Sequence, residues 1–224
     1  MAEQCEMDSI NKYGQVLLSN NKDGYNIKVI TIIGEVEGHE ASGGNTKSTK
    51  YELLLPLLIA AADNKNIDGI LYIMNTVGGD VSCGLAIAEM IASIDKPNVS
   101  LVIGDSHSIG IPLAVASKYS YIVPSGTMIV HPVRLSGTII GAQPTYDYFK
   151  MIEDRIASFV AAHSDTDKES FAKMMVEKGV LAKDLGTVLV GYDAVKCGLI
   201  NEVGGLNDAM NKLKKMIAAS KIDG

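Results

Sequence analysis

Short apolar, β-branched runs alternate with helical segments through the centre of this sequence, and this alternation constrains the fold more than any other feature. Strand-like runs cover residues 26–34, 69–75, 99–103 and 127–130, and apolar residues at helical spacing cover 81–93 and 109–117. Repeated strand–helix–strand units favour a largely parallel sheet with right-handed crossovers. The sequence therefore predicts an α/β fold.

The segments around this centre indicate one domain with a tail. Residues 1–25 are polar and mixed in charge, which predicts a flexible N-terminal tail, and residues 26–224 contain no linker, repeat or low-complexity tract. The glycine-rich stretch 35–47 predicts a loop. Further predicted elements are helices at 48–64, 146–163, 168–178 and 206–219 and strands at 187–190 and 199–203.

Composition bounds the class of protein. The 224 residues are 47% apolar and 21% charged, which is typical of a globular domain, and the net charge of −6 argues against binding to nucleic acid. No apolar run reaches the length of a membrane span, and the first residues lack the pattern of a signal peptide. Three cysteines without metal or disulfide spacing favour a reducing compartment. We therefore expect a cytoplasmic protein with no metal and no other cofactor.

Two turns at the carboxyl ends of neighbouring predicted strands carry the residues that indicate catalysis. Ser106 and Ser108 lie between a strand and a helix, where capping is the ordinary role of serine. The other turn contains Gly79, whose amide, with that of Ile109, could donate to an oxyanion beside Ser108. His131 ends a third strand, and a serine with a histidine suggests a nucleophile and its general base. The sequence therefore predicts a serine hydrolase.

Blocks of sequence around these residues resemble the Clp protease proteolytic subunit family. The similar blocks are GGDVSCGLAIA at 78–88, the nucleophile turn at 104–110, TMIVHP at 127–132 and DAVKCGLI at 193–200. The resemblance covers roughly residues 26–205, with the blocks in the same order. MNTVGGDV and HPVRLSG are also similar to a divergent branch of this family that is assigned to presecretory protein translocation.

The resemblance implies a fold, an activity and partners. The fold would be a ClpP/crotonase-like spiral of ββα units with a mostly parallel sheet and a long protruding helix. The activity would be that of a serine-type endopeptidase, with Ser108 as nucleophile, His131 as general base and the amides of Gly79 and Ile109 as the oxyanion hole. Substrates would be peptides or unfolded proteins. The resemblance further implies a homo-oligomeric ring, with the 146–163 helix between rings, and an ATPase unfoldase as partner.

The third member of the catalytic triad departs from the family pattern. The position of the family's aspartate falls at Gly186, which cannot orient a histidine. The pair Lys183-Asp184 is similar to an Arg-Asp pair of the family, so Asp184 is the predicted acid. A Ser–His dyad, or a carboxylate elsewhere in the chain, is the alternative. His107 is expected to point away from Ser108 and to have a structural role.

Other functions remain as alternatives. Because the acid is displaced, the main alternative is a catalytically weak or inactive ClpP-like scaffold that assembles and binds precursor proteins. A crotonase-type acyl-CoA enzyme would share the architecture, but its chemistry usually depends on carboxylates and gives no reason for pairing Ser108 with His131. A membrane-anchored Ser–Lys signal-peptide peptidase is disfavoured because no anchor is evident and because His131 is available as the base.

Overall fold

The computed structural model describes residues 14–19, 23–39, 43, 45–134, 141–177 and 186–222. The strands are β1 (Gln15–Leu18), β2 (Ile27–Glu37), β3 (Ser48–Lys50), β4 (Gly69–Gly79), β5 (Asn98–Ser106), β6 (Tyr119–Ile122), β7 (Thr127–Val130), β8 (Thr187–Val190) and β9 (Glu202–Val203). The helices are α2 (Tyr51–Asp63), α3 (Val81–Ala92), α4 (Gly110–Val115), α5 (Ala142–Ala162), α6 (Lys168–Val176), α7 (Tyr192–Lys196) and α8 (Leu206–Ser220).

The main sheet runs in the order β1-β2-β4-β5-β6-β9. Its strands are parallel to their neighbours except β1, which is antiparallel to β2. β7 touches β5 through the single parallel pair Asp105–Thr127 and forms an antiparallel ribbon with β8. The mostly parallel sheet with crossover helices confirms the predicted α/β class.

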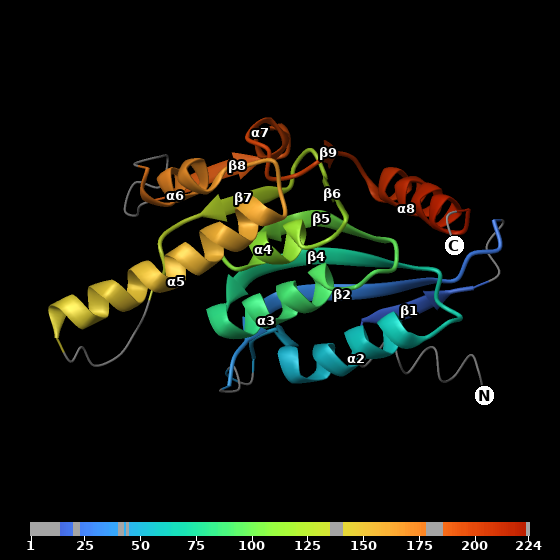
Figure 1. Ribbon diagram of the computed structural model, residues 1–224, viewed down its shortest axis with the longest axis horizontal. Helices are drawn as coiled ribbons and strands as arrows, with labels where there is room; N and C mark the ends of the chain where they lie inside the picture. The colour runs from blue at the N-terminus through green and yellow to red at the C-terminus, as the bar shows by residue number, and fades with distance from the viewer. Residues whose placement is uncertain are drawn as a thin grey trace.

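Helices cover the two faces of the sheet unequally (Figure 1). The larger core lies under α2, α3 and α4, and the smaller core lies under α8, where Leu213 and Ile217 are fully buried together with Leu71 and Leu101 of the sheet. α5 projects well beyond the sheet (Figure 1). Its C-terminal half is anchored in the larger core through Ile156, Phe159 and Val160, so the long protruding helix is also confirmed.

The structure differs from the predicted elements at several boundaries. β1 forms within the stretch expected to be a loose tail, because its four residues complete the edge of β2. Ser48–Lys50 pairs with β2 as β3, so the predicted helix begins only at Tyr51. β6 was not predicted, because YSYI is too short to give a clear alternation. β9 covers only the last two residues of the strand expected at 199–203, and α5 begins four residues earlier than expected.

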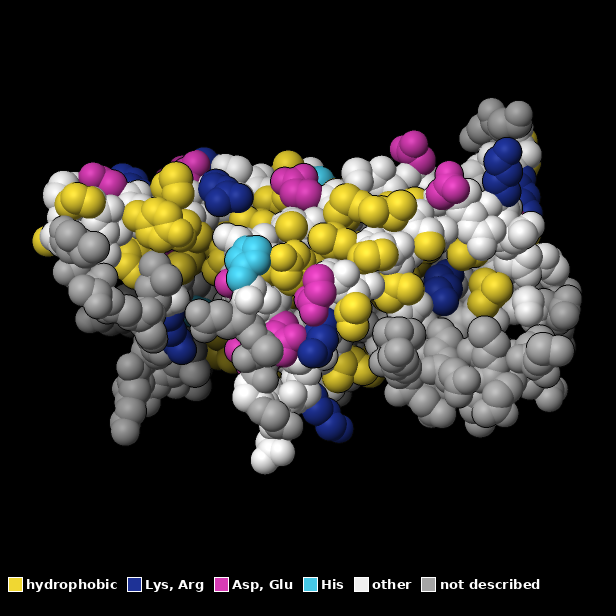
Figure 2. Space-filling model, turned by 90° about the horizontal axis from the view of Figure 1, so that it is seen from below, with side chains coloured by type: hydrophobic (Ala, Val, Ile, Leu, Met, Phe, Trp, Pro, Cys, Tyr) yellow, Lys and Arg dark blue, Asp and Glu magenta, His cyan; other side chains and the backbone are white. Residues whose placement is uncertain are grey.

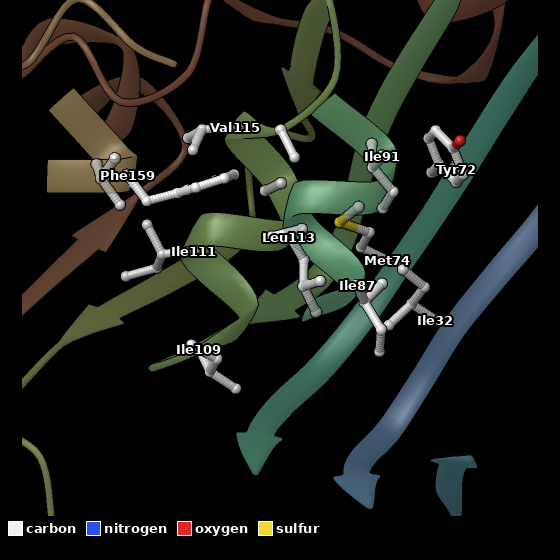
Figure 3. Close-up of a cluster of buried hydrophobic side chains, with 14 of the residues drawn as sticks. Ile32, Tyr72, Met74, Ile87, Ile91, Ile109, Ile111, Leu113, Val115 and Phe159 are labelled. Atoms are coloured by element: carbon white, nitrogen blue, oxygen red, sulfur yellow. The ribbon is translucent and has the colours of Figure 1, made fainter. Parts of the chain in front are cut away.

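The larger core extends directly beneath the predicted nucleophile turn (Figure 3). Ile109 is 1% exposed and packs under α3, where a Cβ added to Gly84 would lie 2.4 Å from Ile109 Cγ1. Ile87 and Met74 continue the same cluster with no exposed surface. The turn is therefore anchored in the core by its own side chain.

We expect Ile87→Ala to lower the free energy of unfolding by about 2 to 5 kcal/mol, because Ile87 is fully buried and its truncation leaves a cavity. Urea unfolding followed by circular dichroism measures this change. The same substitution at Ile222, which is 84% exposed, is the control and should change the free energy by less than about 0.5 kcal/mol. Equal effects at both positions would contradict the packing described here.

Candidate active site

Parallel pairing brings the two predicted catalytic turns together. Thr76 of β4 pairs with Ser106 of β5, so both strands end at the same edge of the sheet. β4 continues into the glycine pair at 78 and 79, and β5 continues into Ser108. A pocket at this edge is lined by Gly79, Ser108 and His131. The structure therefore places three of the predicted site residues around one cavity.

Ser108 occupies a left-handed backbone conformation with φ of 54°, and among the described residues no other non-glycine residue has a positive φ. The main chain holds this conformation from both sides. The Ser108 amide donates to Ile129 O of β7 at 2.9 Å, and the amide of His107 donates to Thr76 O of β4 at 3.0 Å. Such a sharp, over-determined turn exposes the side chain and stores strain, as is common at functional positions.

Ser106, the other serine of this turn, has a structural role. Its side chain is fully buried, and its hydroxyl donates to Gly110 O at 2.7 Å at the start of α4. Because that bond closes the turn below Ser108, Ser106 is not available to a substrate.

The glycine pair allows β4 to approach the serine closely. A Cβ on Gly78 would lie 2.8 Å from Ser108 Cβ and 3.4 Å from the amide nitrogen of Ile109. A Cβ on Gly79 would lie 2.1 Å from Val36 O. Only residues without a side chain fit between these backbones.

Two amides are in a position to bind an oxyanion. The Asp80 amide donates to Val36 O at 2.9 Å, and in a parallel ladder this bond directs the Gly79 N–H away from β2 toward the pocket. Across the described ranges, the Ile109 amide has no hydrogen-bond partner, while its side chain is held in the core. The amides of Gly79 and Ile109 are therefore candidates for an oxyanion hole, and that role stays a prediction.

His131 follows β7 directly and lines the same pocket as Ser108. Its Nδ1 lies 2.7 Å from Pro132 O. Because a carbonyl oxygen only accepts hydrogen bonds, Nδ1 carries a proton, and the neutral ring keeps its lone pair on Nε2. This is the tautomer that a general base for Ser108 requires.

Ser108 and His131 are neighbours but are not directly bonded. In the part of the chain that the structure describes, no hydrogen bond joins the Ser108 hydroxyl to the His131 ring. Such bonds are often loose until substrate binds, so the arrangement remains compatible with catalysis.

The predicted acid, Asp184, lies outside the described residues. Gly186 is described, and a Cβ there would lie 3.0 Å from His131 Cβ and 2.5 Å from Val130 O. The position that corresponds to the family's aspartate is therefore beside the histidine, and it carries no carboxylate. Glycine at this position permits the close approach of the two backbones.

His107 points into a separate polar cluster. Its Nε2 lies 2.9 Å from Thr127 Oγ1, and the Thr127 hydroxyl donates to Asp105 Oδ1 at 2.6 Å. The hydroxyl has one proton, which goes to Asp105, so His107 donates from Nε2. This cluster ties the end of β5 to the start of β7.

Sequence reasoning missed a further polar contact at the pocket. Glu153 of α5 accepts a hydrogen bond from the Val133 amide at 3.1 Å. A signal was present, because Glu153 lies between Phe149 and Ile156 at helical spacing, on the predicted apolar side of its helix. A carboxylate at such a position indicates a specific partner.

Neither a metal centre nor a membrane span is found among the described residues. No group of three or more His, Cys, Asp or Glu side chains in those ranges is arranged to hold a metal ion. None of the helices described has the length and apolar character needed to cross a membrane.

We expect Ser108→Gly to be more stable than Ser108→Ala. Alanine keeps the cost of the left-handed conformation and glycine removes it, which is worth about 0.5 to 1 kcal/mol after the extra freedom of glycine in the unfolded chain is subtracted. Urea unfolding of both variants measures the difference. A more stable alanine variant would contradict the left-handed conformation.

We expect His107→Gln to reduce the acid sensitivity of the fold. The pKa of His107 is lowered, chiefly because the side chain is buried. The carboxylate of Asp105 raises this pKa and the nearby His131 lowers it, and both effects are smaller than that of burial. The unfolded chain therefore binds more protons as the pH falls through about 6.5, the ordinary histidine value, and the folded state loses stability there. Glutamine keeps an Nε2 donor for Thr127 but does not titrate.

Urea midpoints of wild type and His107→Gln at pH 7 and pH 5 test this expectation. The wild-type midpoint should fall more between the two values than that of the variant. Parallel pH dependences would show that His107 does not contribute to acid destabilisation.

Comparison with known proteins identifies the family of this chain. The Clp protease family matches residues 34–206. The translocation-enhancing protein TepA of Halalkalibacterium halodurans is 48% identical over 211 residues, which is 94% of this chain and 82% of that relative. The ATP-dependent Clp protease proteolytic subunit of Leuconostoc citreum is 23% identical over 69% of this chain and 79% of its own length.

A solved structure supports the same architecture. A mutant of ClpP1 from Listeria monocytogenes superposes with a TM-score of 0.64 at 21% identity and covers 81% of this chain and 94% of its own. At that identity the likeness concerns the fold. Family match, relatives and fold agree, and the chain belongs to the Clp protease family.

Proposed function

We propose that this protein is a serine endopeptidase that cleaves peptide bonds through an acyl-enzyme. The observation that carries the proposal is the single pocket in which Ser108, on its left-handed turn, lies with His131 and the amide edge of Gly79. Membership of the Clp protease family supports peptidase chemistry in general.

The mechanism follows from the positions of the groups. The Ser108 hydroxyl attacks the substrate carbonyl while His131 Nε2 takes its proton, and the carbonyl electron pair moves to an oxyanion beside the amides of Gly79 and Ile109. The protonated histidine then gives the proton to the leaving amine, which leaves an acyl-serine. Water attacks the ester by the same route and restores the enzyme. Asp184 is the proposed acid of the triad, and a carboxylate elsewhere in the chain is the competing candidate.

Extended peptides are the substrate class that the edge of β4 favours. β5 pairs with β4 as far as Thr76 and then turns away, and Gly79 at the end of β4 lines the pocket. Val77 is 59% exposed. A peptide strand added here would place a carbonyl at Ser108 through main-chain hydrogen bonds, with little demand on sequence.

Assembly and cellular role extend the proposal. α2 is apolar around most of its circumference, with Leu53 45% exposed and Ile59 56% exposed, and apolar side chains run across this face of the molecule (Figure 2). A surface helix of this kind usually packs against a partner, which supports a homo-oligomer. We infer rings in the cytoplasm, served by an ATPase unfoldase, from family membership, and action on secretory precursors from the similarity to TepA.

One observation favours a second function. His131 Nδ1 is held by a backbone carbonyl, and the position beside it is Gly186, so no described carboxylate contacts the ring. A precursor-binding scaffold with little catalytic activity is therefore the alternative.

Labelling with a fluorophosphonate serine-hydrolase probe tests the proposal on the native oligomer. We expect wild type to be labelled at Ser108, Ser108→Ala to lose labelling entirely, and His131→Ala and Asp184→Asn to lose about 10²-fold or more in rate, because the base and its acid activate the nucleophile. Ser82→Ala, which removes an exposed serine at the start of α3, is the control and should label like wild type.

Mass spectrometry of the adduct locates the modified serine. An unlabelled wild type that is folded and assembled would overturn the peptidase and favour the scaffold. An adduct at another serine would overturn the assignment of Ser108. Normal labelling of Asp184→Asn would remove Asp184 from the mechanism while leaving the peptidase in place.

A further inference from the structure

The orientation of His131 depends on one peptide group. His131 Nδ1–H donates to Pro132 O at 2.7 Å, so the partner usually supplied by the triad acid is here a main-chain carbonyl. A neutral carbonyl fixes the ring and its tautomer. It offers no full negative charge to the imidazolium that forms when Ser108 loses its proton.

The other end of the same peptide group contacts a carboxylate. The peptide bond that contains Pro132 O also contains the Val133 amide, which donates to Glu153 Oε1 at 3.1 Å. In a trans peptide the C=O and N–H point in opposite directions, so the three groups form a continuous chain from imidazole to peptide to carboxylate. An anion on the N–H polarises the peptide and makes its carbonyl a stronger acceptor.

We propose that Glu153 is a positioning residue for His131 that acts through the Pro132–Val133 peptide group and supplies the negative charge usually provided by a triad acid. The proposal rests on the proposed peptidase function. As the Ser108 O–H bond breaks and the Nε2–H bond forms, the Nδ1 proton stays on the ring, and no proton passes along the peptide group to Glu153. Its charge, relayed by the polarised carbonyl, stabilises the imidazolium.

The surroundings of Glu153 fit this role. α5 carries it on the side facing the chain that follows β7, next to a hollow lined by Val133, Phe149 and Lys150. The side chain is partly buried, whereas the neighbouring Asp154 is 62% exposed and pairs with Lys168 at 2.6 Å. Glu153 and Asp154 are adjacent in α5 but have different partners, so a substitution at Asp154 is a matched control for one at Glu153.

The first test compares the second-order rate of fluorophosphonate labelling in the native oligomer. Glu153→Gln keeps an oxygen acceptor for the Val133 amide and removes only the charge, so we expect about a tenfold loss, far less than for removal of a directly bonded triad acid. Glu153→Ala removes the acceptor as well and should lose more. Asp154→Asn makes the same charge change one residue away and should label within about twofold of wild type.

The second test does not depend on catalysis. The Nδ1 proton of His131 is observed by NMR of histidine-labelled protein and assigned by its absence in His131→Ala. Because a proton moves downfield as its hydrogen bond strengthens, the resonance should shift upfield in Glu153→Gln and not in Asp154→Asn. This shift separates a relayed charge from a general packing role, since Glu153→Gln preserves the side-chain shape.

The two tests separate this proposal from the peptidase proposal. An upfield shift with an unlabelled wild type would support the relay and overturn the peptidase. Labelling and resonance unchanged in Glu153→Gln, with both altered in Asp184→Asn, would overturn the relay and assign the acid to Asp184. Failure of Glu153→Ala to fold would not affect the comparison, because Glu153→Gln carries the test.

Discussion

The hydrogen bond from the Ser108 amide to Ile129 O joins the two halves of the candidate site. β5 delivers the serine and β7 delivers His131, and the strands also meet at the Asp105–Thr127 ladder pair and at the contact of His107 with Thr127. This bond holds the left-handed turn from the β7 side. It also places Ser108 beside Ile129, which lies two residues before His131 in the chain. On the other side, the bond from the His107 amide to Thr76 O holds the same left-handed turn against β4.

Close approach of backbones makes the rest of the site. Gly78 faces Ser108 Cβ, Gly79 faces Val36, and Gly186 faces His131, and a Cβ at any of them would fall within 3.0 Å of its neighbour. Glycine at these positions lets the backbones approach closely. The backbone N–H groups there are held in place by the fold, so they need not reorganise when an oxyanion forms. Ile109 completes the arrangement, since its side chain is buried in the core while its amide has no hydrogen-bond partner among the described residues.

Two histidines near the serine are kept distinct by their hydrogen bonds. His107 donates to Thr127 beside Asp105 and serves the junction of β5 and β7. His131 donates to Pro132 O and keeps its other nitrogen free for the pocket. Since the tautomer of each ring is set by its acceptor, sequence adjacency to Ser108 does not decide which histidine is the candidate base.

The sequence by itself determined the parallel core and most of the candidate site. Hydrophobic periodicity is a local property, so strands and helices can be recognised in the sequence without knowledge of the tertiary structure. Their alternation implied a parallel sheet, in which the turns at Gly79 and Ser108 meet at one edge. β1, β6 and the start of α2 escaped prediction because short strands are stabilised by their neighbours in the sheet. The contacts of Gly186 with His131 and of Glu153 with Val133 were decided only by the tertiary structure, since they join residues far apart in sequence whose approach depends on how α5 and the β7–β8 ribbon pack.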